Sequence, residues 1–180
     1  MDLARERDDA YEKLYVELPE GFTTITANMF GDIQIKELYI PVSVTKIEEG
    51  AFGAQIYSTN IRVSSINPKY RSQNGVLYNK KMTTIICYPM SKKGSTFVVP
   101  DTVRKTAPLP FRGNYYLEKV VLPKNLRKLG RGSFLKSAIS EWRCDGGVKK
   151  YEKSAFNYID AADGCIDNSI LFYGKRSEGL

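Results

Sequence analysis

Apolar residues recur in one short arrangement along most of the chain. Apolar residues alternate with other residues, a proline follows, further apolar residues come three positions apart, and a phenylalanine closes the unit. The alternation predicts a short strand with one buried face. Because proline cannot donate to a strand ladder, it ends that strand. The spacing of three that follows suits a tight turn or a single helical turn over the core.

The arrangement occurs five times at a regular interval. The proline position is filled by Pro19, Pro41, Pro100, Pro123 and, in the last copy, Asp145. A phenylalanine follows eleven positions later, at Phe30, Phe52, Phe111, Phe134 and Phe156. The phenylalanines are 22, 59, 23 and 22 positions apart, so the long interval equals one repeat of about 23 plus an insertion of about 36. No copy buries its apolar face alone, so the copies are predicted to stack into a solenoid.

The repeat unit resembles that of the BspA-type leucine-rich-repeat family, and residues 39–52 match it almost completely. Segments 67–80 and 85–89 resemble that family's hairpin-bearing variant repeat. The resemblance covers about residues 16–156, and it implies an α/β leucine-rich-repeat solenoid. We expect strands, short helical turns and about six repeats of 22–23 residues. The departures from the family pattern are at Thr106, Pro108, Pro110, Trp142 and Asp145.

The chain is expected to form one repeat domain over residues 16–180 behind a short helix over residues 1–15. That helix is predicted to cap the first repeat, and a partner-binding helix is the alternative. The insertion, about residues 66–93, is predicted to contain a β-hairpin with arms at 76–78 and 84–87. Its turn is expected at 79–82, where Asn79 tolerates the left-handed conformation, and Asn74-Gly75 supplies another turn. From Asp160 onward, a sixth degenerate copy and a closing strand are both open interpretations.

The closing phenylalanines are the strongest candidates for the core. Phe52, Phe111 and Phe134 are predicted to be buried and to stack in one continuous spine. Small residues precede two of these three phenylalanines, namely Ala51 and Ser133, and they leave room for close stacking.

The charge of the chain is uneven. The net charge of the chain is +7. Residues 1–90 carry −1, whereas residues 91–180, with 17 Lys or Arg and 9 Asp or Glu, carry +8. The C-terminal half is therefore expected to attract anionic partners at low salt. No long apolar run predicts a membrane span. The first residues are too polar for a signal peptide, although a mature sequence whose signal has been removed is an alternative.

No constellation of residues predicts catalysis, a cofactor or a metal. The chain has no histidine, which is the usual partner of a cysteine or serine nucleophile. The chain has three cysteines, Cys87, Cys144 and Cys165. A small, odd number of cysteines argues against a disulfide framework. Cys144 occupies an inward strand position and is predicted to be a small buried residue. We therefore expect a protein that is not an enzyme.

The residues between the inward strand positions are predicted to point outward and to form one continuous face, the concave face of the solenoid. This face is a candidate ligand-binding surface, and a passive solvated sheet is the alternative. The candidate residues are Tyr39, Arg62, Val98, Lys119, Val121, Glu141 and Arg143.

Basic residues gather in the turns of the later repeats. Stacking is expected to bring them into a patch, which is either a solvated rim or a site for an acidic polymer such as a glycosaminoglycan or nucleic acid. Nucleic acid is the weaker option, because the chain has no base-reading motif. These residues are Arg104, Lys105, Lys124, Arg127, Lys128, Arg131, Lys136, Lys149 and Lys150.

Taken together, these features favour a non-enzymatic module that binds a protein or an acidic polysaccharide. The family resemblance implies an adhesion-type protein that is secreted or held at the cell surface. The alternative is a structural spacer that carries another domain and has no ligand of its own.

Overall fold

The computed structural model describes residues 14–30, 35–52, 57–144, 150–151 and 155. These residues form fourteen short strands joined by turns, and they contain no helix. The expected α/β class is therefore wrong for the described part of the chain, which is a β-solenoid. Residues 1–13 of the predicted N-terminal helix and the two interpretations of the segment from Asp160 lie outside the described residues. Tyr15, the last residue of that helix as predicted, already belongs to a strand.

The segment after each proline forms a turn and then a short paired strand rather than a helical turn. The N–H three residues after the proline donates to the proline carbonyl, as in Val103 to Pro100 and Leu126 to Pro123, both at 2.9 Å. A second strand begins two residues later and pairs with the next repeat. The strand ladder thus satisfies the backbone groups that a helix would satisfy internally.

The first strand of each repeat joins one of two parallel sheets. The strands of one sheet are β1 (Tyr15–Glu17), β3 (Glu37–Ile40) and β5 (Asn60–Val63). Those of the other are β9 (Thr96–Val98), β11 (Lys119–Leu122) and β13 (Glu141–Cys144). The predicted inward positions are confirmed: Leu38 pairs with Ile61, and Val120 with Trp142, and all four are buried.

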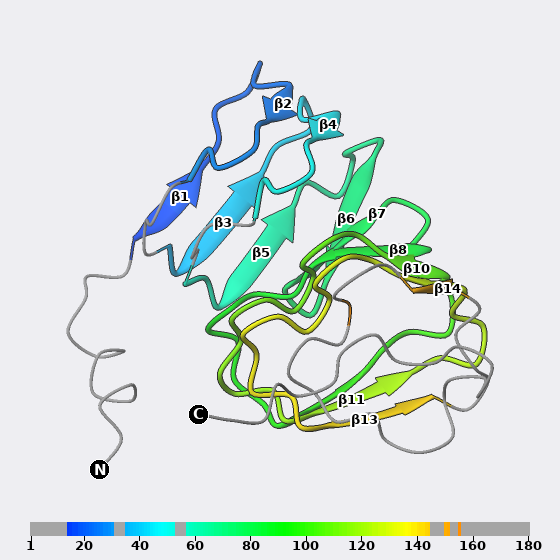
Figure 1. The fold of residues 1–180 in the computed structure, drawn as a ribbon. Coiled ribbons are helices and arrows are strands. Elements are labelled where there is room, and N and C mark those ends of the chain that lie inside the picture. The colour runs from blue at the N-terminus through cyan, green and yellow to red at the C-terminus, as the bar shows by residue number, and fades with distance from the viewer. Residues whose placement is uncertain (1–13, 31–34, 53–56, 145–149, 152–154, 156–180) are drawn as a thin grey trace, which may run out of the picture.

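The second strands form two further sheets (Figure 1). The smaller one pairs β2 (Thr24–Ile25) with β4 (Lys46–Ile47). The larger one has six strands in the order β14-β12-β10-β8-β7-β6. These are β6 (Tyr70–Gln73), β7 (Val76–Asn79), β8 (Thr84–Cys87), β10 (Lys105–Thr106), β12 (Lys128–Leu129) and β14 (Lys150–Tyr151).

The predicted hairpin is present and is larger than expected. β7 and β8 pair antiparallel with a bulge, and the strand β6, which the sequence did not predict, pairs with β7 across the Asn74-Gly75 turn. Both residues of that turn have positive φ, 50° and 77°. In the turn between β7 and β8 the left-handed residue is Met82, not Asn79. Asn79 instead accepts the N–H groups of Thr83 and Thr84 through its side-chain oxygen.

The hairpin covers the edge of β5. Ile61 N–H donates to the Gly75 carbonyl at 3.0 Å, and Val63 N–H donates to Ser72 Oγ at 3.2 Å. The positive φ of 77° favours glycine at position 75. A Cβ there would also lie 2.4 Å from Asn60 Oδ1, so the Asn60 side chain would have to move. The insertion therefore takes the place beside β5 that the next repeat would otherwise fill.

The core consists of two clusters, and the prediction of one phenylalanine spine is wrong. Phe111 and Phe134 are fully buried and stack at 5.5 Å between ring centroids in the C-terminal cluster. Phe52 is only partly buried and stacks with Phe30 at 6.0 Å in the N-terminal cluster. Tyr88, which lies 23 residues before Phe111, continues the C-terminal pair with its ring 5.7 Å from that of Phe111.

Two fully buried asparagines connect successive turns. The Asn67 side-chain amide donates to the carbonyls of Pro41 and Val44 at 2.7 and 2.9 Å. Its oxygen accepts two backbone N–H groups farther along its own loop, those of Lys69 and Tyr70. Asn114 makes the same four kinds of bond farther along the chain.

The departure from the family pattern at Thr106 has a polar explanation. Thr106 is buried, and its hydroxyl accepts the Gly130 N–H at 2.9 Å and pairs with the Ser133 hydroxyl at 3.0 Å. Ser133 in turn donates to the Gly130 carbonyl at 2.7 Å. An apolar residue at position 106 would leave the buried Gly130 N–H without this acceptor.

Candidate binding surfaces

The outward side of β1, β3 and β5 carries aromatic, acidic and basic side chains in register. We call this set the tyrosine face, and it consists of Tyr15, Glu17, Glu37, Tyr39, Asn60 and Arg62. The Arg62 guanidinium lies 5.7 Å from the centre of the Tyr39 ring and pairs with Glu37 at 2.6 Å. Asn60 donates to the other oxygen of the Glu37 carboxylate at 2.6 Å. These contacts orient Arg62 over Tyr39.

Tyr15 adds a second aromatic ring to this face. It lies opposite Glu37, one strand away from and diagonal to Tyr39, a separation of about 7–8 Å in a sheet. Its side chain is 63% exposed, and Lys36 Nζ lies 5.8 Å from the ring centre. Tyr15 is not among the seven candidate residues named from the sequence, and the structure adds it to this face.

The outward side of β9, β11 and β13 has a different character. We call it the valine face, and it consists of Thr96, Val98, Lys119, Val121, Glu141 and Arg143. Val98 and Val121 lie on adjacent strands, and Val98 is 66% exposed. Lys119 forms an ion pair with Glu141 directly across the strands. Arg143 is exposed beside Val121 in the same register.

The seven predicted residues therefore lie on two faces rather than on one. Tyr39 and Arg62 belong to the tyrosine face, and the other five belong to the valine face. Figure 1 shows β1, β3 and β5 in the upper part of the view and β11 and β13 at the bottom, with strands of the six-stranded sheet between them. The prediction of one continuous face is wrong, because the hairpin rather than β9 covers the edge of β5.

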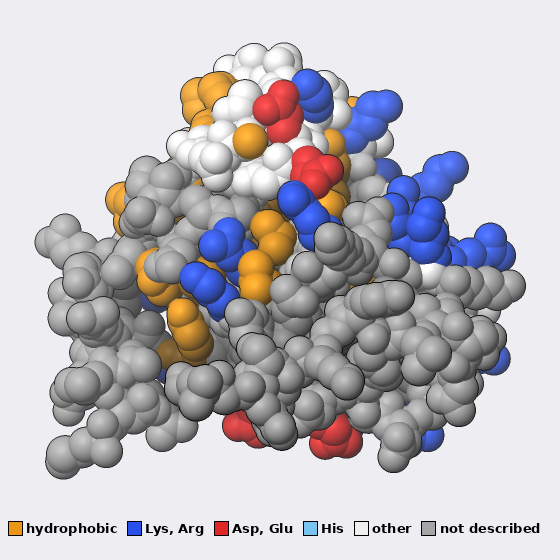
Figure 2. Space-filling model, viewed as in Figure 1, with side chains coloured by type: hydrophobic (Ala, Val, Ile, Leu, Met, Phe, Trp, Pro, Cys, Tyr) orange, Lys and Arg blue, Asp and Glu red, His pale blue; other side chains and the backbone are white. Residues whose placement is uncertain are grey.

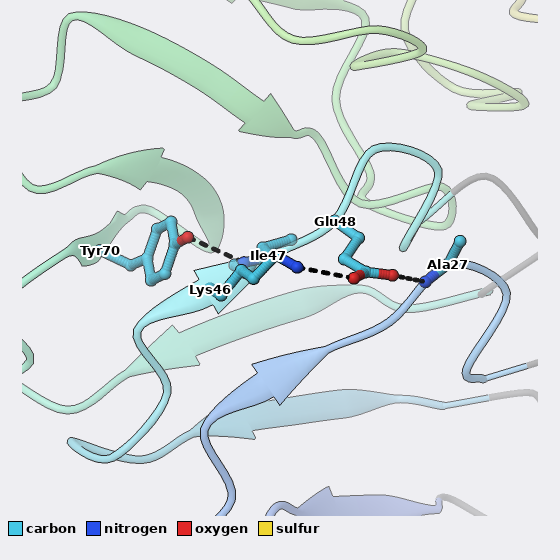
Figure 3. A network of polar contacts seen from close by, with 5 residues as sticks. All are labelled: Ala27, Lys46, Ile47, Glu48 and Tyr70. Atoms are coloured by element: carbon cyan, nitrogen blue, oxygen red, sulfur yellow. Dashed lines mark hydrogen bonds and ion pairs between the residues drawn. The ribbon is translucent and has the colours of Figure 1, made fainter.

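A shallow cleft of about 250 Å³ lies where the second repeat meets the hairpin and residues 107–109. On its rim Glu49 forms an ion pair with Arg131, 82 residues away, at 3.1 Å. Figure 3 shows the neighbouring Glu48, whose carboxylate accepts from Lys46 at 2.9 Å and from the Ala27 N–H at 3.2 Å. These bonds hold the pKa of Glu48 below its ordinary value.

Tyr70 completes this network. Its hydroxyl accepts the Ile47 N–H at 2.9 Å (Figure 3), and burial raises its pKa. The polar groups around the cleft are therefore already bonded to one another. Their arrangement indicates a structural connection between repeats rather than a set of groups converging on a ligand.

The thiol of Cys87 in the hairpin is expected to react slowly with alkylating reagents. Cys87 is partly buried against the N-terminal cluster, and desolvation raises its pKa to about 12. Since only the thiolate is nucleophilic, its thiolate fraction at pH 8 is about a thousandfold below that of a thiol with the ordinary value of 9.0. We predict that iodoacetamide labels Cys87 at least about a hundredfold more slowly in the folded protein than in urea.

Peptide mass spectrometry after timed quenching measures this labelling rate site by site. Buried Cys144 serves as the internal comparison. Equal labelling rates at Cys87 in the folded and unfolded protein would contradict the burial of its thiol.

No helix of the described residues has the length and apolar character needed to cross a membrane. Nor do those residues contain a group of three or more side chains suited to holding a metal ion.

The architecture is thus a β-solenoid in which each repeat contributes a first strand, a proline turn and a second strand. Six copies of the BspA type leucine rich repeat region match residues 10–93 and 86–170. The chain belongs to this family. None of the curated proteins matches the sequence significantly.

Solved structures of similar shape come from bacterial proteins, two of which are described as leucine-rich. A leucine-rich repeat protein from Eubacterium ventriosum is 30% identical, with a TM-score of 0.66 over 71% of this chain and 37% of its own. The pneumococcal vaccine antigen PcpA is 20% identical and has a TM-score of 0.66; the match covers 79% of this chain and 47% of PcpA. A leucine rich cell surface protein from Faecalibacterium prausnitzii is 22% identical and has a TM-score of 0.62; the match covers 72% of this chain and 41% of that protein. This chain therefore spans less than half of each of these proteins.

Proposed function

We propose that this chain is a non-enzymatic interaction domain that binds a protein partner through the tyrosine face. The observation that carries the proposal is the exposed Tyr15 beside Tyr39, with Arg62 held over the latter ring. Tyrosine and arginine are enriched among residues that dominate binding energy at protein interfaces. They stand here on paired strands, which hold them in place before a partner arrives.

The valine face is the second candidate contact surface. Val98 and Val121 present adjacent apolar side chains, and the charged residues Lys119, Glu141 and Arg143 flank them. An apolar centre with a polar rim is the usual anatomy of a protein interface.

A structural spacer is the competing proposal. A spacer needs only stacked repeats and gives no reason for an exposed tyrosine on a sheet.

The location we propose is the cell surface or the extracellular space. Support comes from family membership and from the similar Faecalibacterium prausnitzii protein, which is described as a cell surface protein.

Selection of phage-displayed random peptides on the immobilised domain tests the proposal. We predict that peptides enriched on the wild type are lost from the Tyr15→Ala/Tyr39→Ala variant. They should be retained on Val98→Ser/Val121→Ser and on the hairpin-turn control Lys80→Ala/Lys81→Ala, because binding hot spots are local. A spacer would enrich no peptide that distinguishes the tyrosine variant from the wild type.

A further inference from the structure

Strand β9 is paired along only one of its edges. The Ser95 carbonyl accepts an N–H of β11 at 2.8 Å, and the Val99 N–H donates to β11 at 2.9 Å. Backbone groups of successive residues in a strand point to opposite edges, so those of Phe97 also face β11. The N–H and C=O groups of Thr96 and Val98 therefore point the other way.

The side of β9 away from β11 is open. Val98 is 66% exposed, and Thr96 is exposed as well. Among the residues that the structure describes, none pairs with these two residues along that edge, and β9 is the last strand of its sheet. The hairpin, which covers the edge of β5, pairs with β8 instead of β9. An unpaired edge of this kind can accept a further strand.

The edge of β9 suits a second copy of the chain better than the outer side of the six-stranded sheet does. Figure 2 shows Lys and Arg side chains gathered at the right of the view, where Figure 1 places β8, β10 and β14. Two copies that met there would bring like charges together. Strand β9 itself, with the sequence Thr96-Phe97-Val98, contains no charge and no proline that would protect its edge.

We propose that β9 is a self-association site, at which two copies of this chain pair their β9 strands antiparallel around a two-fold axis at Phe97. In this register Thr96 of each copy lies opposite Val98 of the other, and the two pairs exchange four backbone hydrogen bonds. The two three-stranded sheets become one sheet of six strands. The site is separate from the tyrosine face, which lies on another sheet, and does not depend on it.

The backbone on either side of β9 favours this register over the adjacent ones. An axis at Val98 would place Pro100 opposite Thr96, and proline has no N–H to donate. An axis at Thr96 would place Gly94 opposite Val98, and Gly94 has a φ of 125°, outside the range of a strand. Only the axis at Phe97 gives every facing N–H and C=O group a partner.

The side chains also match in this register. Phe97 is partly buried, with its ring 4.9 Å from that of Tyr88, and the pairing sets it beside Phe97 of the second copy. Lys93 lies four residues before Phe97 and Asp101 four residues after it, so each Lys93 comes opposite Asp101 of the other copy. Both are exposed, and no ion pair within the described ranges involves either of them.

Sedimentation equilibrium of the whole chain, over about a hundredfold range of concentration, tests the site by mass action. We predict that the mean mass rises from 20.4 kDa toward twice that value. Val98→Pro removes an N–H at the free edge and leaves the bonds to β11 in place, so it should raise the dimer dissociation constant about tenfold or more. The control Val98→Ala keeps the N–H and should change the constant less than about threefold.

Exchange of the two charges tests the register. Lys93→Glu sets two acidic residues opposite each other and should raise the dissociation constant by about three- to tenfold at low ionic strength. The double variant Lys93→Glu/Asp101→Lys restores the opposite charges and should return the constant to within about twofold of the wild type. This comparison decides the register even where Val98→Pro fails to fold, which thermal unfolding of each variant reveals.

Each other outcome overturns the proposal. A mass of 20.4 kDa at every concentration would exclude self-association. Equal losses in Val98→Pro and Val98→Ala would indicate contact through the side chains of the valine face instead of strand pairing. A dimer lost in Tyr39→Ala but kept in Val98→Pro would assign self-association to the tyrosine face.

Discussion

Truncation of Phe134 to alanine should destabilise the folded protein by roughly 3–5 kcal/mol. Phe134 is fully buried and lies 5.5 Å from Phe111 in an almost parallel stack, so the substitution removes a large apolar contact and leaves a cavity between repeats. Urea unfolding of the whole chain, followed by circular dichroism, measures the change in unfolding free energy.

The matched comparison is Phe52→Ala. Phe52 fills the same position in its repeat but is only partly buried, so its loss should cost clearly less than that of Phe134. A loss below about 1 kcal/mol at Phe134, in the range of surface substitutions, or a larger loss at Phe52, would contradict the assignment of the two clusters.

Replacement of Asn114 by alanine should cost roughly 2–4 kcal/mol, although it removes only a small polar side chain. The substitution leaves the N–H groups of Tyr116 and Leu117 and the carbonyls of Pro89 and Lys92 without their side-chain partner. Asn114 is fully buried, so water does not readily replace these bonds.

The control for Asn114 is Asn125→Ala. Asn125 is exposed in a proline turn, and its truncation should change the unfolding free energy by less than about 0.5 kcal/mol. The same urea titration serves for both variants. Similar small effects at the two positions would mean that the buried asparagine does not connect the turns as described.

The stacking of repeats was predictable because it depends on a local pattern. Strand side chains alternate, and a fixed repeat length brings equivalent residues opposite one another. The inward residues Leu38, Val120 and Trp142 follow directly from this periodicity. The register of Lys105, Lys128 and Lys150 on neighbouring strands follows from the same periodicity, since these lysines are 23 and 22 positions apart.

The division into two faces and two clusters was not predictable, because it depends on where the insertion packs. The sequence indicated a hairpin but not that it would cover the edge of β5. The strand β6 was missed because Tyr70–Gln73 is largely polar and shows no apolar alternation. Tyr88 was missed because the search for the closing residue followed phenylalanine, whereas the third repeat uses a tyrosine 23 residues before Phe111.

The buried polar contacts could not be predicted from the sequence either. Asn67 and Asn114 each precede a strand by a few residues, but their acceptors lie in the preceding turn, 22 to 26 residues away. Thr106 stands in an apolar position because its hydroxyl meets Gly130 and Ser133 of the next repeat. Such partners are set by the stacked geometry and not by local propensity.

Calorimetric titration of one selected peptide against single variants tests the proposed binding role most directly. If the tyrosine face is the binding surface, Tyr39→Ala should raise the dissociation constant by about 30-fold or more, which corresponds to a hot-spot loss of about 2 kcal/mol. The hairpin variant Lys80→Ala/Lys81→Ala should bind as the wild type does. Unchanged affinity in Tyr39→Ala together with lost affinity in the hairpin variant would place the site on the hairpin and contradict the account.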